Sequence, residues 1–64
     1  MSRFYRRPEV ESRTGLGKSE IYRRAASGDF PKPLKLGHRY TAWIAEEVDQ
    51  WVHDQIRRVR GAAS

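Results

Sequence analysis

The chain has 64 residues, no cysteine and a formal net charge of +5. We expect a single domain, and one of this size buries only about 60% of the surface of its unfolded chain, which leaves little room for a catalytic cleft. The lack of cysteine excludes disulfides and thiolate metal sites. No apolar run has membrane-spanning length and no signal-peptide core is present, so we expect a soluble, cytoplasmic protein.

The positive charge is unevenly distributed along the chain. Residues 1–43 carry ten Lys or Arg and four Asp or Glu, whereas residues 44–64 carry three and four. Ten of the thirteen cations are arginines, whose guanidinium fork can bind a phosphate or a guanine edge through paired hydrogen bonds. Nucleic acid is therefore the leading candidate partner.

The N-terminal part begins with a basic lead-in, residues 1–6. A first helix is predicted from Pro8 to about Thr14. Pro8 has the fixed backbone angle of a first helical position, and Glu9 and Glu11 supply the negative charge that the helix dipole favours near its start. The glycine after Thr14 begins a turn.

That turn, Gly-Leu-Gly at residues 15–17, has the length of roughly three to four residues found in helix-turn-helix units. Leu16 is the expected apolar plug between two helices, and the second helix begins at about Lys18. Gly17 is an acceptable N-cap. Glu20 is expected to reach back to the free amides as part of a capping box.

The second helix has two unlike faces. Ile21 and Ala25 share one face through their i, i+4 spacing, and we expect this face to be buried. The opposite face, expected to be exposed, carries Ser19, Tyr22, Arg23 and Ala26. Gly28 can end the helix in a left-handed conformation, and Phe30 is the expected apolar anchor of the following loop.

A two-stranded hairpin is predicted around a Gly37-His38 turn. On either side of the turn, apolar residues alternate with Lys35, Arg39 and Thr41. The alternating apolar residues are Leu34, Leu36, Tyr40 and Ala42. Because an isolated hairpin is only marginally stable, we expect it to pack on the helices.

The last predicted element is a helix from about Ala45 to Arg60, followed by a frayed tail at residues 61–64. Its apolar residues recur at helical spacing, which predicts one buried stripe. The stripe consists of Ile44, Val48, Trp51, Val52, Ile56 and Val59. Acidic residues near the start and arginines near the end match the helix dipole.

Several short motifs follow one another in a distinctive order and spacing. They are Arg7-Pro8-Glu9-Val10, Thr14-Gly15-Leu16, Ser19-Glu20-Ile21-Tyr22-Arg23, Gly28-Asp29-Phe30-Pro31-Lys32-Pro33, Leu36-Gly37-His38-Arg39, and Trp43 with Glu47-Val48-Asp49-Gln50-Trp51. From about Tyr5 to Ile56 the chain thereby resembles the AlpA family of small phage and prophage transcriptional regulators. The resemblance implies a winged helix-turn-helix, mainly helical with a small β-hairpin and related in fold to phage excisionases and MerR-type regulators. It places the second helix in a DNA major groove and the hairpin against the flanking backbone or minor groove.

Candidate DNA contacts on the second helix follow from this arrangement. Arg23 can reach a base edge, since an Arg fork on guanine is the commonest specific contact; the alternative is a solvated surface charge. Lys18 and Ser19, at the helix N-terminus, are expected to meet phosphate. Tyr22 either donates its hydroxyl to phosphate or packs against the hairpin.

On the hairpin, Arg39 is the main candidate, with His38 at the tip as a weaker companion. The alternative for Arg39 is an ion pair with Glu47 or Asp49. Lys32 and Lys35 are expected to add affinity without reading sequence.

No catalytic or metal site is expected. His38 and His53 are the only histidines, and neither a phosphate-cradling glycine loop nor a nucleophile with an evident base is present. Trp43 and Trp51 are assigned to core packing in preference to base stacking. We therefore expect no enzyme and no cofactor.

These features favour a sequence-specific transcriptional regulator of a phage or mobile element that binds double-stranded DNA. One small module contacts few base pairs, so further copies on repeated sites are expected partners, and integrase or RNA polymerase are further candidates. Two alternatives stay open: an excisionase that bends DNA at an attachment site, and a small phage inhibitor that docks on an acidic host protein. A membrane-surface role for the last helix is disfavoured by the acids in its first half.

Overall fold

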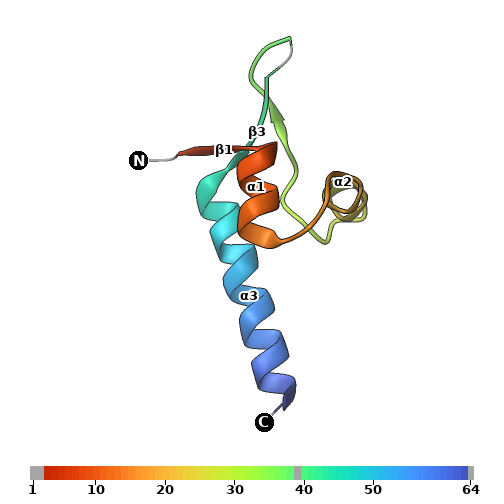
Figure 1. Ribbon diagram of the computed structural model, residues 1–64, viewed down its shortest axis with the longest axis vertical. Coiled ribbons are helices and arrows are strands. Elements are labelled where there is room, and N and C mark those ends of the chain that lie inside the picture. Colours follow the sequence, from red (N-terminus) through yellow and green to blue (C-terminus); the bar gives the residue numbers. More distant parts are fainter. Residues whose placement is uncertain (1–2, 39, 64) are drawn as a thin grey trace.

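The computed structural model describes residues 3–38 and 40–63. Its elements are β1 (Phe4–Arg6), α1 (Arg7–Thr14), α2 (Lys18–Ala26), β2 (Leu34–Lys35), β3 (Thr41–Ile44) and α3 (Ala45–Ala63) (Figure 1). Three helices with a small antiparallel sheet are consistent with a winged helix-turn-helix, so the predicted fold class is confirmed. The helices begin close to the predicted positions.

Residues 4–6 of the predicted lead-in form a strand, so the sheet has three strands in the order β1-β3-β2. Tyr5 lies opposite Trp43 in the register and is 5% exposed. Its hydroxyl donates to the Asp49 carboxylate on α3, at 3.0 and 3.2 Å from the two oxygens. β1 thus ties the N-terminal segment to both the sheet and the last helix.

The turn between α1 and α2 is held by backbone geometry and one hydroxyl. Gly15 has a φ of 76°, which an L side chain rarely adopts, and its N–H donates to the Glu11 carbonyl at 2.8 Å. The Thr14 hydroxyl accepts from the Leu16 N–H at 3.2 Å. Leu16 packs partly buried against the core, in agreement with the predicted plug.

The core lies between the sheet and the three helices. Its largest fully buried side chains are Trp43, Ile21, Val10 and Val48. Burial of Ile21, Ala25 and Phe30 confirms the predicted buried face of α2 and the loop anchor. The Trp43 indole N–H donates to the Pro31 carbonyl at 3.0 Å, so the polar atom of the buried ring has a partner.

The hairpin of β2 and β3 projects away from the helices (Figure 1). The Leu36 N–H donates to the Tyr40 carbonyl at 2.8 Å and closes the loop. Leu34 and Leu36 are 38% and 46% exposed. The hairpin packs on the helices through β3, where Ala42 and Trp43 are buried, whereas these two leucines are exposed because the strands extend beyond the body of the protein.

Helix α3 also extends beyond the body, in the direction opposite to the hairpin (Figure 1). It continues through Ala63, so the predicted frayed tail is wrong for residues 61–63. Of the predicted buried stripe, Val48 is buried, whereas Ile56 and Val59 are 44% and 68% exposed because the other helices do not reach them. Within the described residues, no helix has the length and apolar character needed to cross a membrane.

Candidate nucleic-acid interface

Helix α2 lies at the side of the molecule with one face in the core and one in solvent. Ile21 and Ala25 are 0% and 4% exposed and fix the orientation of the helix. The opposite face is exposed as predicted and presents Ser19, Tyr22 and Arg23; Lys18, the first residue of the helix, is exposed as well. All four candidate contacts are therefore accessible from solvent.

The N-terminus of α2 is open to solvent. Gly17 is the N-cap in an extended conformation, and no side chain caps the first turn. Lys18 and Ser19, the first two helical residues, are both exposed beside the free amides. Free N–H groups and the positive end of the helix dipole favour an anion at such a position, and the adjacent Lys18 ammonium increases that preference.

Glu20 does not form the predicted capping box. Its carboxylate instead accepts hydrogen bonds from Arg23, with Nε at 3.2 Å, and from Arg24, with Nε at 2.7 Å. Two arginines one turn further along the helix outcompete the backbone amides because their bonds are charge-assisted at both ends. The bond from Arg23, and then that from Arg24, lower the pKa of the Glu20 carboxyl, while the same carboxylate raises the pKa of Arg23.

The two arginines have different surroundings. Arg24 also contacts Asp29, with Nη1 at 2.9 Å from the carboxylate, and its side chain is 29% exposed. The Arg23 side chain is 66% exposed and Glu20 is its one ion-pair partner within the described residues. Arg24 therefore has a structural role, whereas Arg23 has only one contact to give up before it can reach another molecule.

Tyr22 links α2 to the hairpin, and Lys35 lies on the same side of the sheet. The Tyr22 ring lies 5.9 Å from the Trp43 ring, centroid to centroid, and the residue is still 37% exposed. Lys35 pairs with Thr41, which shares a sheet face with Trp43 because side chains alternate along a strand. Lys35 and Tyr22 thus lie on the same side of the sheet, and the ring packing expected as one option for Tyr22 leaves part of it accessible.

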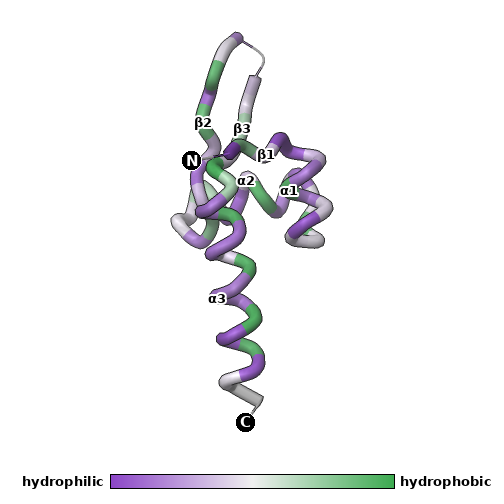
Figure 2. Tube along the Cα trace, turned by 90° about the vertical axis from the view of Figure 1, so that its left-hand side faces the viewer, coloured by the Kyte–Doolittle hydropathy of each residue, from purple (hydrophilic) through white to green (hydrophobic). Residues whose placement is uncertain are grey.

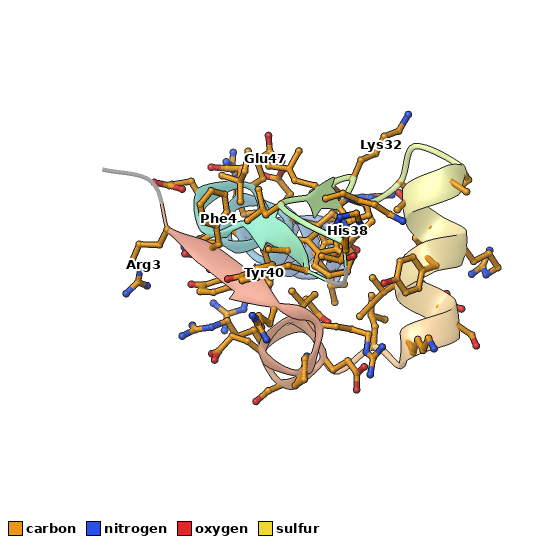
Figure 3. The ribbon with its side chains drawn as sticks, turned by 90° about the horizontal axis from the view of Figure 1, so that it is seen from above. Arg3, Phe4, Lys32, His38, Tyr40 and Glu47 are labelled. Carbon is orange, nitrogen blue, oxygen red and sulfur yellow. The ribbon has the colours of Figure 1, made fainter. Side chains whose placement is uncertain are left out.

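The tip of the hairpin supplies the remaining candidates. His38 is exposed, whereas Arg39 lies outside the described residues (Figure 3). Of the two acids considered as partners for Arg39, Asp49 already accepts from Tyr5. Arg6, which the sequence interpretation did not single out, lies over the ring of Tyr40, the residue that follows the hairpin loop, at 3.9 Å.

Both tryptophans have structural contacts. Trp43 is fully buried, and Trp51, half-buried, packs its edge on Phe30 with ring centroids 4.9 Å apart. The Trp51 indole N–H donates to the Asp29 carbonyl at 2.8 Å. In the part of the chain that the structure describes, no group of three or more acidic or histidine side chains is arranged to hold a metal ion.

A winged helix-turn-helix with a basic, outward-facing second helix defines the class of small DNA-binding regulators. Residues 3–56 match the family model described as prophage CP4-57 regulatory protein (AlpA). The chain therefore belongs to the AlpA family, and the resemblance drawn from the sequence motifs is confirmed. It is a member of a family of DNA-binding transcriptional regulators of phage origin.

Two relatives cover most of the chain. It is 42% identical over 60 residues to the uncharacterized protein ORF88 of Enterobacteria phage P4, covering 92% of this chain and 68% of that protein. It is 29% identical over 63 residues to the DNA-binding transcriptional activator AlpA of Escherichia coli (strain K12), covering 89% of this chain and 90% of the relative. No solved structure matches the chain.

Proposed function

We propose that the protein is a sequence-specific regulator that binds double-stranded DNA with α2 in the major groove and the hairpin against the flanking backbone or minor groove. The observation that carries this proposal is the outward face of α2, where Ser19, Tyr22 and Arg23 are exposed on a helix held from behind by core residues, with Lys18 exposed at its N-terminus. Family membership and the name of the Escherichia coli relative support it.

In this proposal the role of each α2 residue depends on its position along the helix. Lys18 and Ser19 hold a phosphate at the helix N-terminus, which sets the depth of the helix in the groove. Arg23 exchanges its contact with Glu20 for a guanine edge. Arg24 stays on Glu20 and Asp29, so the carboxylate keeps a partner after Arg23 leaves.

The hairpin adds contacts that do not depend on base sequence. Lys35 and His38 are exposed along its length, and Arg39, the residue after His38, is the further cation that we assign to this role. Phosphate contacts of this kind release counterions, so they raise affinity for every duplex and make binding salt-dependent.

Arg23→Ala tests whether Arg23 recognises the base sequence of the DNA. We expect a loss of about 1–3 kcal/mol on the preferred site and a relaxed preference at one or two base pairs, because a base-edge donor fork is removed. The preferred site is first selected from random duplexes, and single-base variants are then titrated. Arg58→Ala, which removes an exposed arginine of α3, is the matched control; an equal loss on all sequences would make Arg23 a phosphate contact.

Arg39→Ala tests the role of the hairpin. We expect weaker binding to all duplexes alike and a salt slope reduced by about 1, since one phosphate contact is lost. Titrations across a range of salt concentrations measure the slope. An unchanged slope with a lower melting temperature would assign Arg39 to an ion pair within the fold.

The proposal also includes the consequence of DNA binding, which is either transcriptional regulation or excision. We infer transcriptional regulation, as the name of the Escherichia coli relative suggests. We also infer a cytoplasmic location, with integrase or RNA polymerase as candidate partners. An excisionase would instead bend its site, which circular-permutation mobility of a bound fragment measures. An unbent complex supports the regulator, whereas a strongly bent one at an attachment site supports the excisionase.

A further inference from the structure

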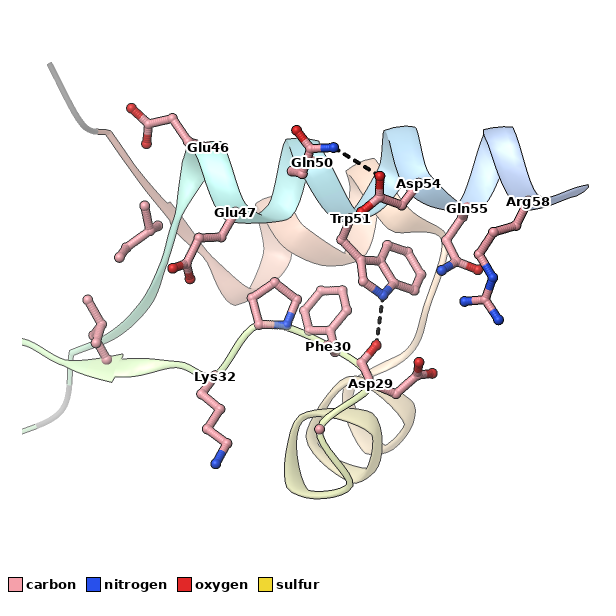
Figure 4. A pocket seen from close by; sticks show the side chains of 14 residues that line it. Asp29, Phe30, Lys32, Glu46, Glu47, Gln50, Trp51, Asp54, Gln55 and Arg58 are labelled. Carbon is pink, nitrogen blue, oxygen red and sulfur yellow. Dashed lines mark hydrogen bonds between the residues drawn. The ribbon is translucent and has the colours of Figure 1, made fainter. Parts of the chain in front are cut away.

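An open groove of about 810 Å³ runs between α3 and residues 28–34, the segment that joins α2 to β2 (Figure 4). Trp51 and Phe30, packed edge to face, form part of its lining together with Pro31. The bond from the Trp51 indole to the Asp29 carbonyl fixes this wall. The groove is thus a preformed surface, in a part of the molecule that the proposed DNA contacts do not use.

The polar lining of the groove is mainly acidic. Four carboxylates line it against two cations, Lys32 and Arg58; the carboxylates are Asp29, Glu46, Glu47 and Asp54. Asp29 is paired with Arg24, and Asp54 accepts from Gln50 at 2.9 Å. Glu46 and Glu47 are exposed, and their carboxylates have no hydrogen bond or ion pair with any described residue. A partner for this groove must therefore be basic.

The partner must also present apolar side chains to the groove. Leu34 and Ile44 line the same groove, and Phe4 lies opposite Ile44 in the sheet. Leu34 is 38% and Phe4 47% exposed, so apolar surface continues from the groove onto the neighbouring strands. Contiguous exposed apolar surface beside a polar rim marks an interaction site.

The distal part of α3 has the complementary character. Ile56 and Val59 are exposed at i, i+3 spacing and share a surface hollow with Arg60. Arg57, which follows Ile56 in the sequence, is a second exposed cation of this region. Figure 2 shows apolar segments recurring along α3 beyond the level of the other helices. We call this set, Ile56, Arg57, Val59 and Arg60, the α3 tail.

The tail cannot reach the groove of its own chain. The groove is lined by one face of α3 between Glu46 and Arg58, whereas Ile56 and Val59 lie on another face of the same continuous helix, Ala45–Ala63. Pairing two tails with each other would bring the three arginines of each copy, Arg57, Arg58 and Arg60, close to those of the other. Like charges at that distance disfavour such a symmetric contact.

We propose that the α3 tail of one copy docks into the acidic groove of a second copy. Ile56 and Val59 meet the apolar lining, and Arg57 and Arg60 meet Glu46 and Glu47. Each copy has one groove and one tail, so the contact is head-to-tail and can repeat along a row of copies. The inference goes beyond DNA binding and is tested without DNA, so its failure leaves the proposed function untouched.

Sedimentation velocity of the full chain over a concentration series is the first measurement. We expect reversible growth beyond a dimer in the wild type. A groove variant, Glu46→Gln with Glu47→Gln, and a tail variant, Ile56→Ser with Val59→Ser, should each weaken association about tenfold or more. Glu9→Gln with Glu11→Gln makes the same change of charge on α1 and should associate like the wild type. Circular dichroism melts confirm that each variant is folded.

Mixing the groove variant with the tail variant tests the head-to-tail geometry of the contact. The groove variant keeps an intact tail and the tail variant an intact groove, so together they should form a heterodimer that does not grow further. A wild type that stays monomeric at its highest soluble concentration overturns the proposal. So does a groove variant that associates as well as the wild type, or a mixture that forms no heterodimer.

Discussion

At the scale of single residues, the contact with Glu20 restrains the side chain of Arg23, the main candidate for base recognition. The pair holds the guanidinium along the helix in the free protein, and the same contact lowers the pKa of the Glu20 carboxyl. Binding therefore requires an exchange of partners. A base edge that matches the Arg fork can replace the carboxylate, whereas a mismatched one cannot, which makes the contact a source of discrimination.

Glu20→Gln tests this exchange. We expect tighter binding to all duplexes, because one negative charge near the phosphates is removed, and a smaller difference between specific and non-specific sites, because Arg23 is no longer held. Glu9→Gln is the matched control: Glu9 forms an equivalent pair with Arg13 at 2.8 Å, but on α1. Titrations on the selected site and on a scrambled duplex give both quantities. Equal discrimination in the two variants would contradict the role of the pair.

The spacing of Glu20, Arg23 and Arg24 was visible in the sequence, yet the capping box was predicted instead. Both interpretations use the same carboxylate, and the sequence does not show which donor lies nearer. By contrast, the exposed face of α2 was predicted correctly from helical spacing alone, because Ile21 and Ala25 leave only one face for the core. DNA contact by that face stays a prediction.

At the scale of elements, the local sequence predicted α1, α2 and the hairpin well and missed β1. A strand of three residues has no periodicity to detect, and β1 exists because its backbone pairs with β3, which is remote in the chain. The end of the buried stripe on α3 was also beyond prediction. Helical spacing shows which residues share a face but not how far the neighbouring helices extend along it.

Tyr5→Phe tests how β1 is attached to α3. We expect a loss of about 1 kcal/mol in the free energy of unfolding, because the hydroxyl bond is removed and the ring stays in place. The Asp49 carboxylate is exposed and regains water, which keeps the loss small. Tyr22→Phe is the control, since no hydrogen bond of its hydroxyl supports the fold among the described contacts. Chemical denaturation of both variants provides the comparison, and equal stability of the two would show that backbone pairing alone holds β1.

At the scale of the whole molecule, the shape separates three surfaces: the exposed face of α2, the hairpin and the distal half of α3. The principal extents are 46 × 28 × 19 Å, and the hairpin and the distal half of α3 lie at opposite ends of the long axis (Figure 1). The small core between them must hold both projections and α2 in fixed relation. Any loss of core packing therefore acts on the DNA surface and on the proposed self-association surface together.

Trp43→Ala and Trp51→Ala separate the scaffold from the interface. Trp43 is fully buried and contacts both Tyr22 and the Pro31 carbonyl, so its truncation should cost about 3–5 kcal/mol, comparable to the lower end of total stability for a small domain. Trp51 is half-buried, and its truncation should cost about 2 kcal/mol. We expect the Trp43 variant to be largely unfolded and the Trp51 variant to be folded with a lower melting temperature.

Melts recorded with and without DNA distinguish the two tryptophans further. Because DNA binds only the folded state, a saturating duplex should raise the melting temperature of the Trp51 variant by the same amount as that of the wild type. The Trp43 variant should regain part of its helical signal as DNA is added, since binding draws the equilibrium toward the folded form. A Trp51 variant that melts as expected but gains nothing from DNA would place Trp51 at the interface, and would move the DNA-binding surface from the exposed face of α2 to the groove beside α3.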